Sequence, residues 1–106
     1  MIKTLLERGA DVNKGDRNGK TALMRAAEDG HIETIECLLN NAYVAINQRT
    51  QEGLTALMFA VRGQENNEDI VKIFLRYGAD VDQQDIRGRT ALMIAITLKK
   101  KSIIKS

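Results

Sequence analysis

The strongest constraint on the fold is a short motif that occurs three times at a nearly fixed spacing. Thr21, Thr55 and Thr90 each stand at the centre of the same pattern, and they lie 34 and 35 residues apart. In each copy a glycine precedes the threonine by two positions, and Ala-Leu-Met with a further alanine follows it. A period of about 20 to 50 residues is typical of stacked repeat proteins. We therefore expect similar units that form a binding surface rather than a catalytic pocket.

A second series of residues supports the same period. The segment from Leu5 to Asn13 returns as Phe74 to Asp82, with a Gly-Ala-Asp turn in the same place. The copy between them, Leu38 to Asn47, lacks this turn and contains one extra residue. Together the two series resemble the ankyrin repeat family, whose unit of about 33 residues is a projecting hairpin or loop followed by two antiparallel helices. The resemblance covers nearly the whole chain and implies an all-α solenoid with β-hairpin or loop tips.

The resemblance divides one domain, residues 1–106, into four segments. Residues 16–49 and 50–84 are expected to be complete repeats, whereas residues 1–15 and 85–106 are expected to be partial ones. A solenoid needs about three stacked repeats and polar ends for independent stability. Two interpretations therefore stay open: a piece of a longer array, and a minimal protein whose charged ends solvate the stack.

Apolar spacing predicts the buried faces of the helices. In the first complete repeat, Thr21 is expected to begin the inner helix and Gly30 to end it. The outer helix should bury a stripe at amphipathic spacing, made of Ile32, Ile35, Leu38 and Leu39. In the next repeat, Thr55 to Val61 should form the inner helix, and the outer stripe should be Ile70, Val71, Phe74 and Leu75. Gln64 to Asn67 are expected to lengthen the turn between these two helices, where insertions are tolerated.

The inner helices depart from the family motif Thr-Pro-Leu-His at two positions. Alanine replaces the proline, and Met24, Met58 and Met93 stand where the motif places histidine. In the family, the threonine and the histidine hydrogen-bond around the start of the inner helix. We expect this polar link to be missing here and replaced by core packing of the thioether groups. A methionine-lined metal or redox site is the alternative interpretation.

Residues suited to catalysis or metal binding are scarce. His31 and Cys37 are the single histidine and cysteine, so His and Cys of one chain cannot supply a four-ligand zinc site. They lie six residues apart, on different turns of a helix, which disfavours a nucleophilic pair. Several acidic residues follow the repeat and are expected to hydrogen-bond backbone amides in turns: Asp11, Asp16, Asp80, Asp82 and Asp85. We expect no enzyme activity, no cofactor and no metal.

Charge is distributed unevenly along the chain. The net charge is +2, and four lysines at positions 99, 100, 101 and 105 account for it, because the preceding residues carry two more acidic than basic side chains. Four aromatic residues are too few for a base-stacking platform, so nucleic-acid binding is not expected. The lysines are expected to solvate a helix end, although a nuclear-import or anionic-surface role stays open.

The sequence also indicates the cellular compartment in which the protein is expected. The N-terminal residues lack the apolar region of a secretion signal, and no apolar run approaches about 18 residues. A single cysteine cannot form an internal disulfide and fits a reducing compartment. The expected location is therefore the cytoplasm, with the nucleus as an alternative, and no membrane is expected as a partner.

The ankyrin resemblance implies that a protein partner binds the loop tips and the exposed face of the inner helices. Carried over position by position, this predicts a partner-binding surface of Arg17, Asn18, Lys20, Glu28, Asp29, Arg49, Gln51, Glu52, Leu54, Arg62, Gln84, Ile86, Arg87 and Arg89, with Thr97 on the same face. Leu54 and Ile86 are expected to be exposed beside arginines, a composition enriched at interface centres.

This composition favours a partner with an acidic, partly apolar segment. The simpler alternative is that solvated tips just contain long polar side chains. A functional alternative is a ligand-sensing segment of a larger protein, of the kind that recognises an oligonucleotide. The expected state is a monomer or one part of a longer repeat array.

Overall fold

The structure of the protein is a computed structural model that describes residues 12–41, 43–63 and 67–98. In these ranges the chain forms five helices and no strand: α2 (Ala22–Asp29), α3 (Ile32–Leu39), α4 (Ala56–Arg62), α5 (Asn67–Arg76) and α6 (Ala91–Thr97). The predicted all-α fold is confirmed. The predictions for Met1 to Arg8, Gly9, Asp11, residues 64–66 and the lysines from position 99 onward lie outside the described residues.

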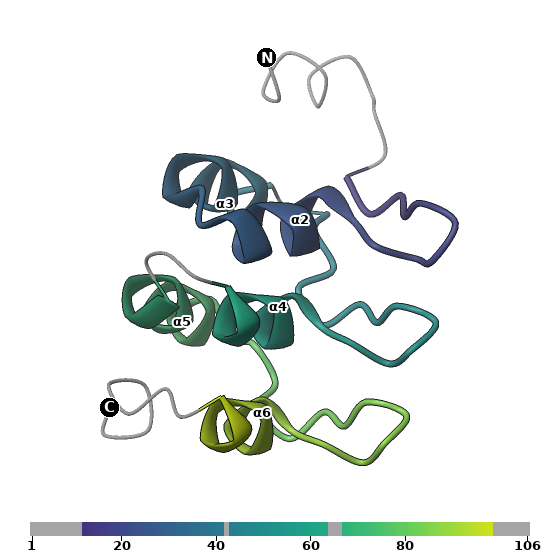
Figure 1. Ribbon diagram of the computed structural model, residues 1–106. Coiled ribbons are helices and arrows are strands. Elements are labelled where there is room, and N and C mark those ends of the chain that lie inside the picture. The colour runs from purple at the N-terminus through teal and green to yellow at the C-terminus, as the bar shows by residue number, and fades with distance from the viewer. Residues whose placement is uncertain (1–11, 42, 64–66, 99–106) are drawn as a thin grey trace.

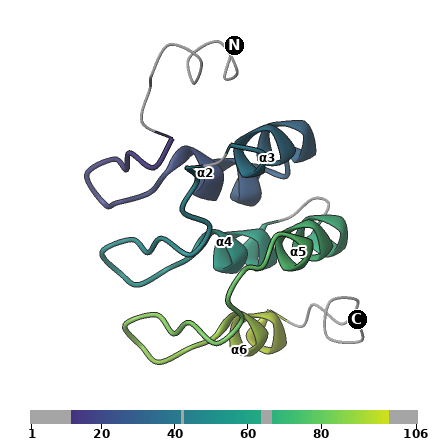
Figure 2. The same ribbon diagram turned by 180° about the vertical axis from the view of Figure 1, so that it is seen from behind.

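The helices are stacked in layers, and each layer carries a loop that projects to the same side (Figure 1). The inner helices α2, α4 and α6 form the centre of the stack, because α4 packs against both of the others. The outer helices α3 and α5 pack on α2 and α4 respectively. Seen from behind, the three loops lie above one another on the side away from α3 and α5 (Figure 2). The repeat in the sequence thus becomes a repeat in space.

Each inner helix begins at the threonine of the repeated motif, as predicted. The hydroxyl oxygens of Thr21, Thr55 and Thr90 each accept a hydrogen bond from the backbone N–H three residues later, at 3.3 Å. This cap satisfies one of the N–H groups that a helix start leaves without a partner inside the helix. The first inner helix ends at Gly30, whose φ of 78° is the left-handed conformation that glycine adopts without strain.

The methionines of the motif correct one prediction. The polar link at the helix start is present in α2 and α4, because the Thr21 and Thr55 N–H groups donate to the sulfur atoms of Met24 and Met58, at 3.3 and 3.4 Å. Both methionines are 1% exposed, so their predicted place in the core is confirmed. Met93 is 49% exposed and receives no such bond from the described residues. For Met93, the prediction of core packing was wrong, because no described layer covers α6.

The hydrophobic core runs between the inner and outer helices of neighbouring layers. The predicted stripe of α3 is confirmed, since Ile32 is partly buried and the other three side chains are buried. In α5, Ile70 and Phe74 are fully buried and Val71 is partly buried against the core. Leu75 is instead 48% exposed, so its predicted burial was wrong. It lines a groove of about 240 Å³ between α5 and α6 that no described residue fills.

Candidate functional site

The projecting loops share one internal hydrogen-bond pattern. In each loop a side-chain oxygen accepts hydrogen bonds from the backbone N–H groups two and four residues later, at 2.8 to 3.2 Å. The oxygens belong to Asp16, Thr50 and Asp85, which occupy the same position of the repeat. Such bonds stabilise turns locally. The prediction that Asp16 and Asp85 hydrogen-bond backbone amides is confirmed.

The loops are also bonded to one another. The Gln51 N–H donates to the carbonyl of Asn18, and the Ile86 N–H donates to the carbonyl of Glu52, both at 2.9 Å. The side chains of Gln51 and Arg49 add hydrogen bonds to backbone carbonyls of a neighbouring loop, at 2.8 and 2.6 Å. Arg49 and Gln51 were predicted to bind a partner, and in the structure they help to hold neighbouring loops in register.

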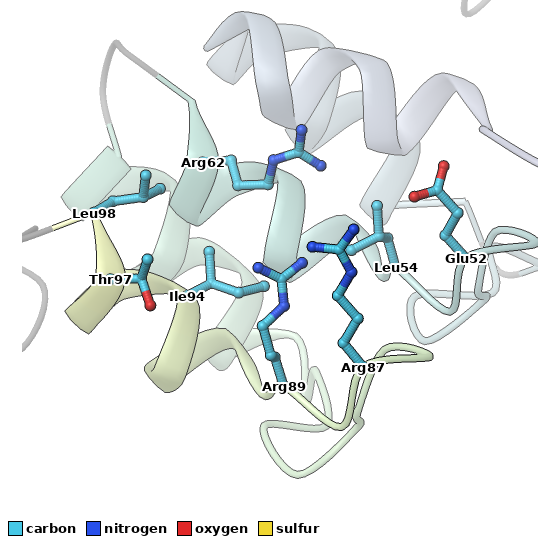
Figure 3. A pocket seen from close by; sticks show the side chains of 8 residues that line it. All are labelled: Glu52, Leu54, Arg62, Arg87, Arg89, Ile94, Thr97 and Leu98. Carbon is cyan, nitrogen blue, oxygen red and sulfur yellow. The ribbon is translucent and has the colours of Figure 1, made fainter.

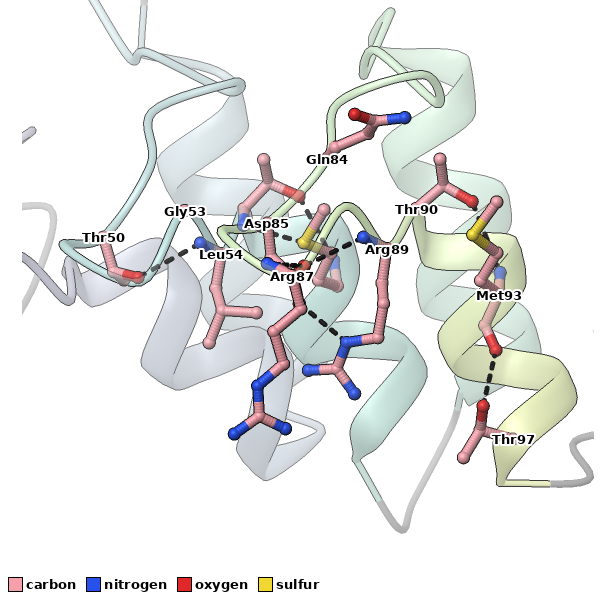
Figure 4. A network of polar contacts seen from close by, with 12 residues as sticks. Thr50, Gly53, Leu54, Gln84, Asp85, Arg87, Arg89, Thr90, Met93 and Thr97 are labelled. Carbon is pink, nitrogen blue, oxygen red and sulfur yellow. Dashed lines mark hydrogen bonds and ion pairs between the residues drawn. The ribbon is translucent and has the colours of Figure 1, made fainter.

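Asp85 anchors the third loop. The carboxylate is buried, and its second oxygen accepts a hydrogen bond from Nε of Arg89 at 2.9 Å (Figure 4). Burial raises the pKa of Asp85, but the hydrogen bonds from Arg89 and Arg87 and the positive charge of Arg89 outweigh it, so the pKa lies below its ordinary value. The carboxylate is charged at neutral pH and fixes both the loop and the Arg89 side chain.

Two adjoining pockets lie between the loops and the inner helices. The larger, of about 330 Å³, is lined by Glu52, Leu54, Arg62, Arg87, Arg89, Ile94, Thr97 and Leu98. The smaller, of about 210 Å³, is lined by Asn18, Lys20, Glu28, Thr50, Glu52, Leu54, Phe59 and Arg62. Because Glu52, Leu54 and Arg62 line both, the two pockets form one continuous surface, which we call the loop–helix groove.

Arginines gather in the larger pocket. Arg62 comes from α4 and Arg87 and Arg89 come from the third loop, and their side chains project toward the same space (Figure 3). Within the described residues, Arg62 and Arg87 form no ion pair, whereas Arg89 is paired with Asp85. Glu52 is the carboxylate among the lining residues. This end of the groove therefore carries an excess of positive charge.

In the smaller pocket, the positive and negative side chains are more nearly equal in number than in the larger pocket. Lys20 forms an ion pair with Glu28, and its Nζ lies 4.7 Å from the centre of the Phe59 ring. The guanidinium of Arg62 lies 5.4 Å from the same ring centre. Two cations thus contact Phe59, whose side chain is 5% exposed. Such contacts stabilise the orientation of Lys20 and Arg62 over the Phe59 ring.

The structure places the predicted partner-binding residues as follows. Exposed are Arg17, Asn18, Asp29, Arg49, Gln51, Glu52, Arg62, Gln84, Ile86 and Arg87, and half-buried are Lys20, Glu28 and Arg89. Ile86 is 70% exposed, as expected. Leu54 is only 6% exposed, so the prediction that it is presented to solvent was wrong. Its N–H is bound to Thr50, and its side chain packs into the core beneath the groove.

The groove brings together only some of the predicted residues. Asn18, Lys20, Glu28, Glu52, Leu54, Arg62, Arg87 and Arg89 line it, and the exposed Thr97 does as well. The remaining ones lie on the loops or, for Asp29, at the end of α2. Sequence reasoning missed four lining residues: Thr50, Phe59, Ile94 and Leu98. Phe59 precedes Arg62 by three residues. This spacing places both on one helix face and is the sequence signal from which the contact could have been predicted.

Three further properties of the described residues bear on function. They contain no group of three or more His, Cys, Asp or Glu side chains with the geometry of a metal site. No helix in the described ranges is long and apolar enough to cross a membrane. Cys37 is half-buried on α3.

Comparison with known proteins identifies several relatives. The family description "ankyrin repeats (3 copies)" matches residues 1–85 and residues 43–106. The mouse B-cell lymphoma 3 protein homolog is 36% identical over 100 residues, which are 91% of this chain and 22% of that protein. The chicken nuclear factor NF-kappa-B p105 subunit is 34% identical over 99 residues, 91% of this chain and 10% of that protein.

An enzyme is also among the relatives. The L-asparaginase of Dirofilaria immitis is 28% identical in an alignment 135 residues long, which covers 98% of this chain and 23% of the enzyme. The chain therefore spans less than a quarter of the length of each of these three proteins.

Proposed function

The chain belongs to the ankyrin repeat family, and we propose that it is a non-catalytic module that binds a protein partner in the loop–helix groove. Ankyrin repeats in general mediate protein–protein interaction, which is the premise of the proposal. The observation that carries it is the groove itself, which joins loops and inner helices of neighbouring layers around arginines and an apolar floor. Arginines next to desolvated apolar side chains are typical of interface centres.

A catalytic role is not part of the proposal. The L-asparaginase is the relative with an enzymatic name, but this chain corresponds to 23% of it, so most of that enzyme has no counterpart in the sequence.

The proposed organisation is the one expected from the repeat, with complete units at residues 16–49 and 50–84 and partial units at residues 1–15 and 85–106. The proposed location is the cytoplasm or the nucleus.

The oligonucleotide-sensing alternative has less support. Stacking of bases requires an accessible aromatic face. Phe59 is the aromatic residue that lines the groove, and its ring is 5% exposed beneath Lys20 and Arg62. A base would have to displace both cations to reach it. We therefore favour a protein partner.

The test is affinity capture from a native lysate with quantitative mass spectrometry. One bait carries Arg62→Gln and Arg87→Gln in the groove, and the matched control carries Lys72→Gln and Arg76→Gln on α5, so both lose the same charge at exposed positions. Circular dichroism verifies that both are folded. We expect a protein that the wild type and the control capture and the groove variant does not. Equal capture by all three baits would contradict the groove as the binding site.

A further inference from the structure

We propose that Arg62, Arg87 and Arg89 form a carboxylate-binding subsite, here named the arginine pocket, which takes an acidic side chain of the partner beside an apolar one. The inference rests on the proposed function and names the chemistry of the partner segment. It follows from the charge of the pocket, from the way two of its arginine side chains are held, and from the composition of its walls.

Unpaired charge is the first observation. Arg62 and Arg87 have no carboxylate partner in the described residues, and Glu52 is the acidic side chain that lines the pocket with them. The bond from Arg89 to Asp85 uses Nε, and the described residues accept no hydrogen bond from its two terminal nitrogens. A guanidinium presents its donors as a planar fork that matches the two oxygens of a carboxylate.

The second observation is that the side chains of Arg62 and Arg89, two of the three arginines, are held in place before any ligand binds. The Asp85 carboxylate accepts hydrogen bonds from the backbone N–H groups of Arg87 and Arg89 at 2.9 Å, and from Nε of the Arg89 side chain at 2.9 Å (Figure 4). Arg62 belongs to the layer before and is oriented by its contact with the Phe59 ring. Side chains that are already positioned lose less conformational entropy on binding.

The composition of the walls decides between classes of partner. Leu54, Ile94 and Leu98 lie beside the arginines, so an apolar side chain fits next to the bound carboxylate (Figure 3). The neighbouring pocket holds the Lys20–Glu28 ion pair, so the positive charge does not extend along the groove. A nucleic-acid strand needs a continuous basic track. A peptide that alternates acidic and apolar residues matches this short, mixed surface.

The experiment measures binding of fluorescent peptides to the full chain by anisotropy. The probe is an eight-residue peptide of alternating glutamate and leucine, and the matched controls replace glutamate with glutamine, leucine with serine, or glutamate with phosphoserine. Oligothymidylate serves as the nucleic-acid control. We expect the glutamate–leucine peptide to bind more tightly than all four. The glutamine and serine peptides lose the carboxylate or the apolar contact. The phosphoserine peptide and oligothymidylate bring more negative charge than the three arginines, already offset by Glu52 and Asp85, can balance.

Variants of the protein test the assignment to the arginines. Arg62→Gln and Arg87→Gln should each weaken binding of the glutamate–leucine peptide about tenfold, since hydrogen bonds to charged groups are the strong ones. Arg87→Lys keeps the charge but not the fork and should also weaken binding, whereas Arg76→Gln on α5 should leave it unchanged. Thermal unfolding verifies that each variant is folded.

Several outcomes would overturn the arginine pocket. They are equal binding of the glutamine peptide, an effect of Arg76→Gln as large as that of Arg87→Gln, tighter binding of the phosphoserine peptide or oligothymidylate, and no binding of the probe. The lysate capture separates this failure from failure of the proposed function. A partner lost with the double groove variant would still support the groove when the peptide does not bind.

Discussion

Single residues of this protein combine packing with a polar role. The sulfur atoms of Met24 and Met58 are buried, and each also accepts a backbone N–H bond at the start of its helix. A thioether sulfur is a weak acceptor, but a buried N–H group without any acceptor lowers stability. Methionine therefore supplies the hydrogen bond that the resemblance assigns to histidine, while it also fills the core.

The first prediction concerns this sulfur acceptor. Met58→Leu keeps the volume but leaves the Thr55 N–H without its acceptor, so it should lower the free energy of unfolding by about 1–3 kcal/mol. Met93→Leu, at the same position of the next repeat, should change it by less than about 0.5 kcal/mol, because Met93 is half exposed. Urea unfolding followed by circular dichroism measures both. Equal effects of the two substitutions would refute a role for the sulfur.

At the scale of the elements, the loops depend on glycine in different ways along the stack. Gly53 and Gly88 occupy the same loop position and have φ values of 79° and 76°, a region that favours glycine. A Cβ atom on Gly53 would lie 2.9 Å from the Cα of Asp85 and 3.0 Å from the Ile86 nitrogen, whereas nothing lies within 4 Å of one on Gly88. Close approach of the next loop therefore adds a second requirement at Gly53.

The second prediction separates these two requirements. Gly88→Ala should lower the free energy of unfolding by about 1–2 kcal/mol, the strain of a left-handed alanine. Gly53→Ala should cost more, because the third loop must also move away from the second. The difference in urea unfolding between the variants isolates the loop contact. Identical values would show that the loops do not need their close approach.

For the whole molecule, the position in the stack determines what one motif does. Leu57 and Val61 on α4 are 4% and 2% exposed, since α6 and α5 pack around them. Their counterparts on α6, Leu92 and Ile96, are 56% and 55% exposed. The residue types are similar, but no described layer follows α6. Burial here is thus a property of the stack and not of the motif.

The third prediction follows from this difference. Leu57→Ala should lower the free energy of unfolding by about 2–5 kcal/mol, as expected for a large-to-small substitution in a core. Leu92→Ala should lower it by less than about 1 kcal/mol, because little apolar surface leaves a buried environment. The measurement is again urea unfolding of the full chain. A comparable loss for both variants would mean that α6 is covered in solution.

The sequence by itself determined the repeat, the all-α class, the threonine that begins each inner helix and the turn role of Asp16 and Asp85. These features are local, because caps and turns form within about four residues of the chain and recur with the motif.

Only the tertiary structure decided which apolar side chains are buried in the stack and which are exposed to solvent. Leu54 turned out to be buried, and Met93 and Leu75 turned out to be exposed, because burial depends on the adjoining layer. The repeat placed Arg62, Arg87 and Arg89 on one predicted surface, but only the stacking of α4 on α6 decided that they line the same pocket, since Arg62 lies 25 positions before Arg87.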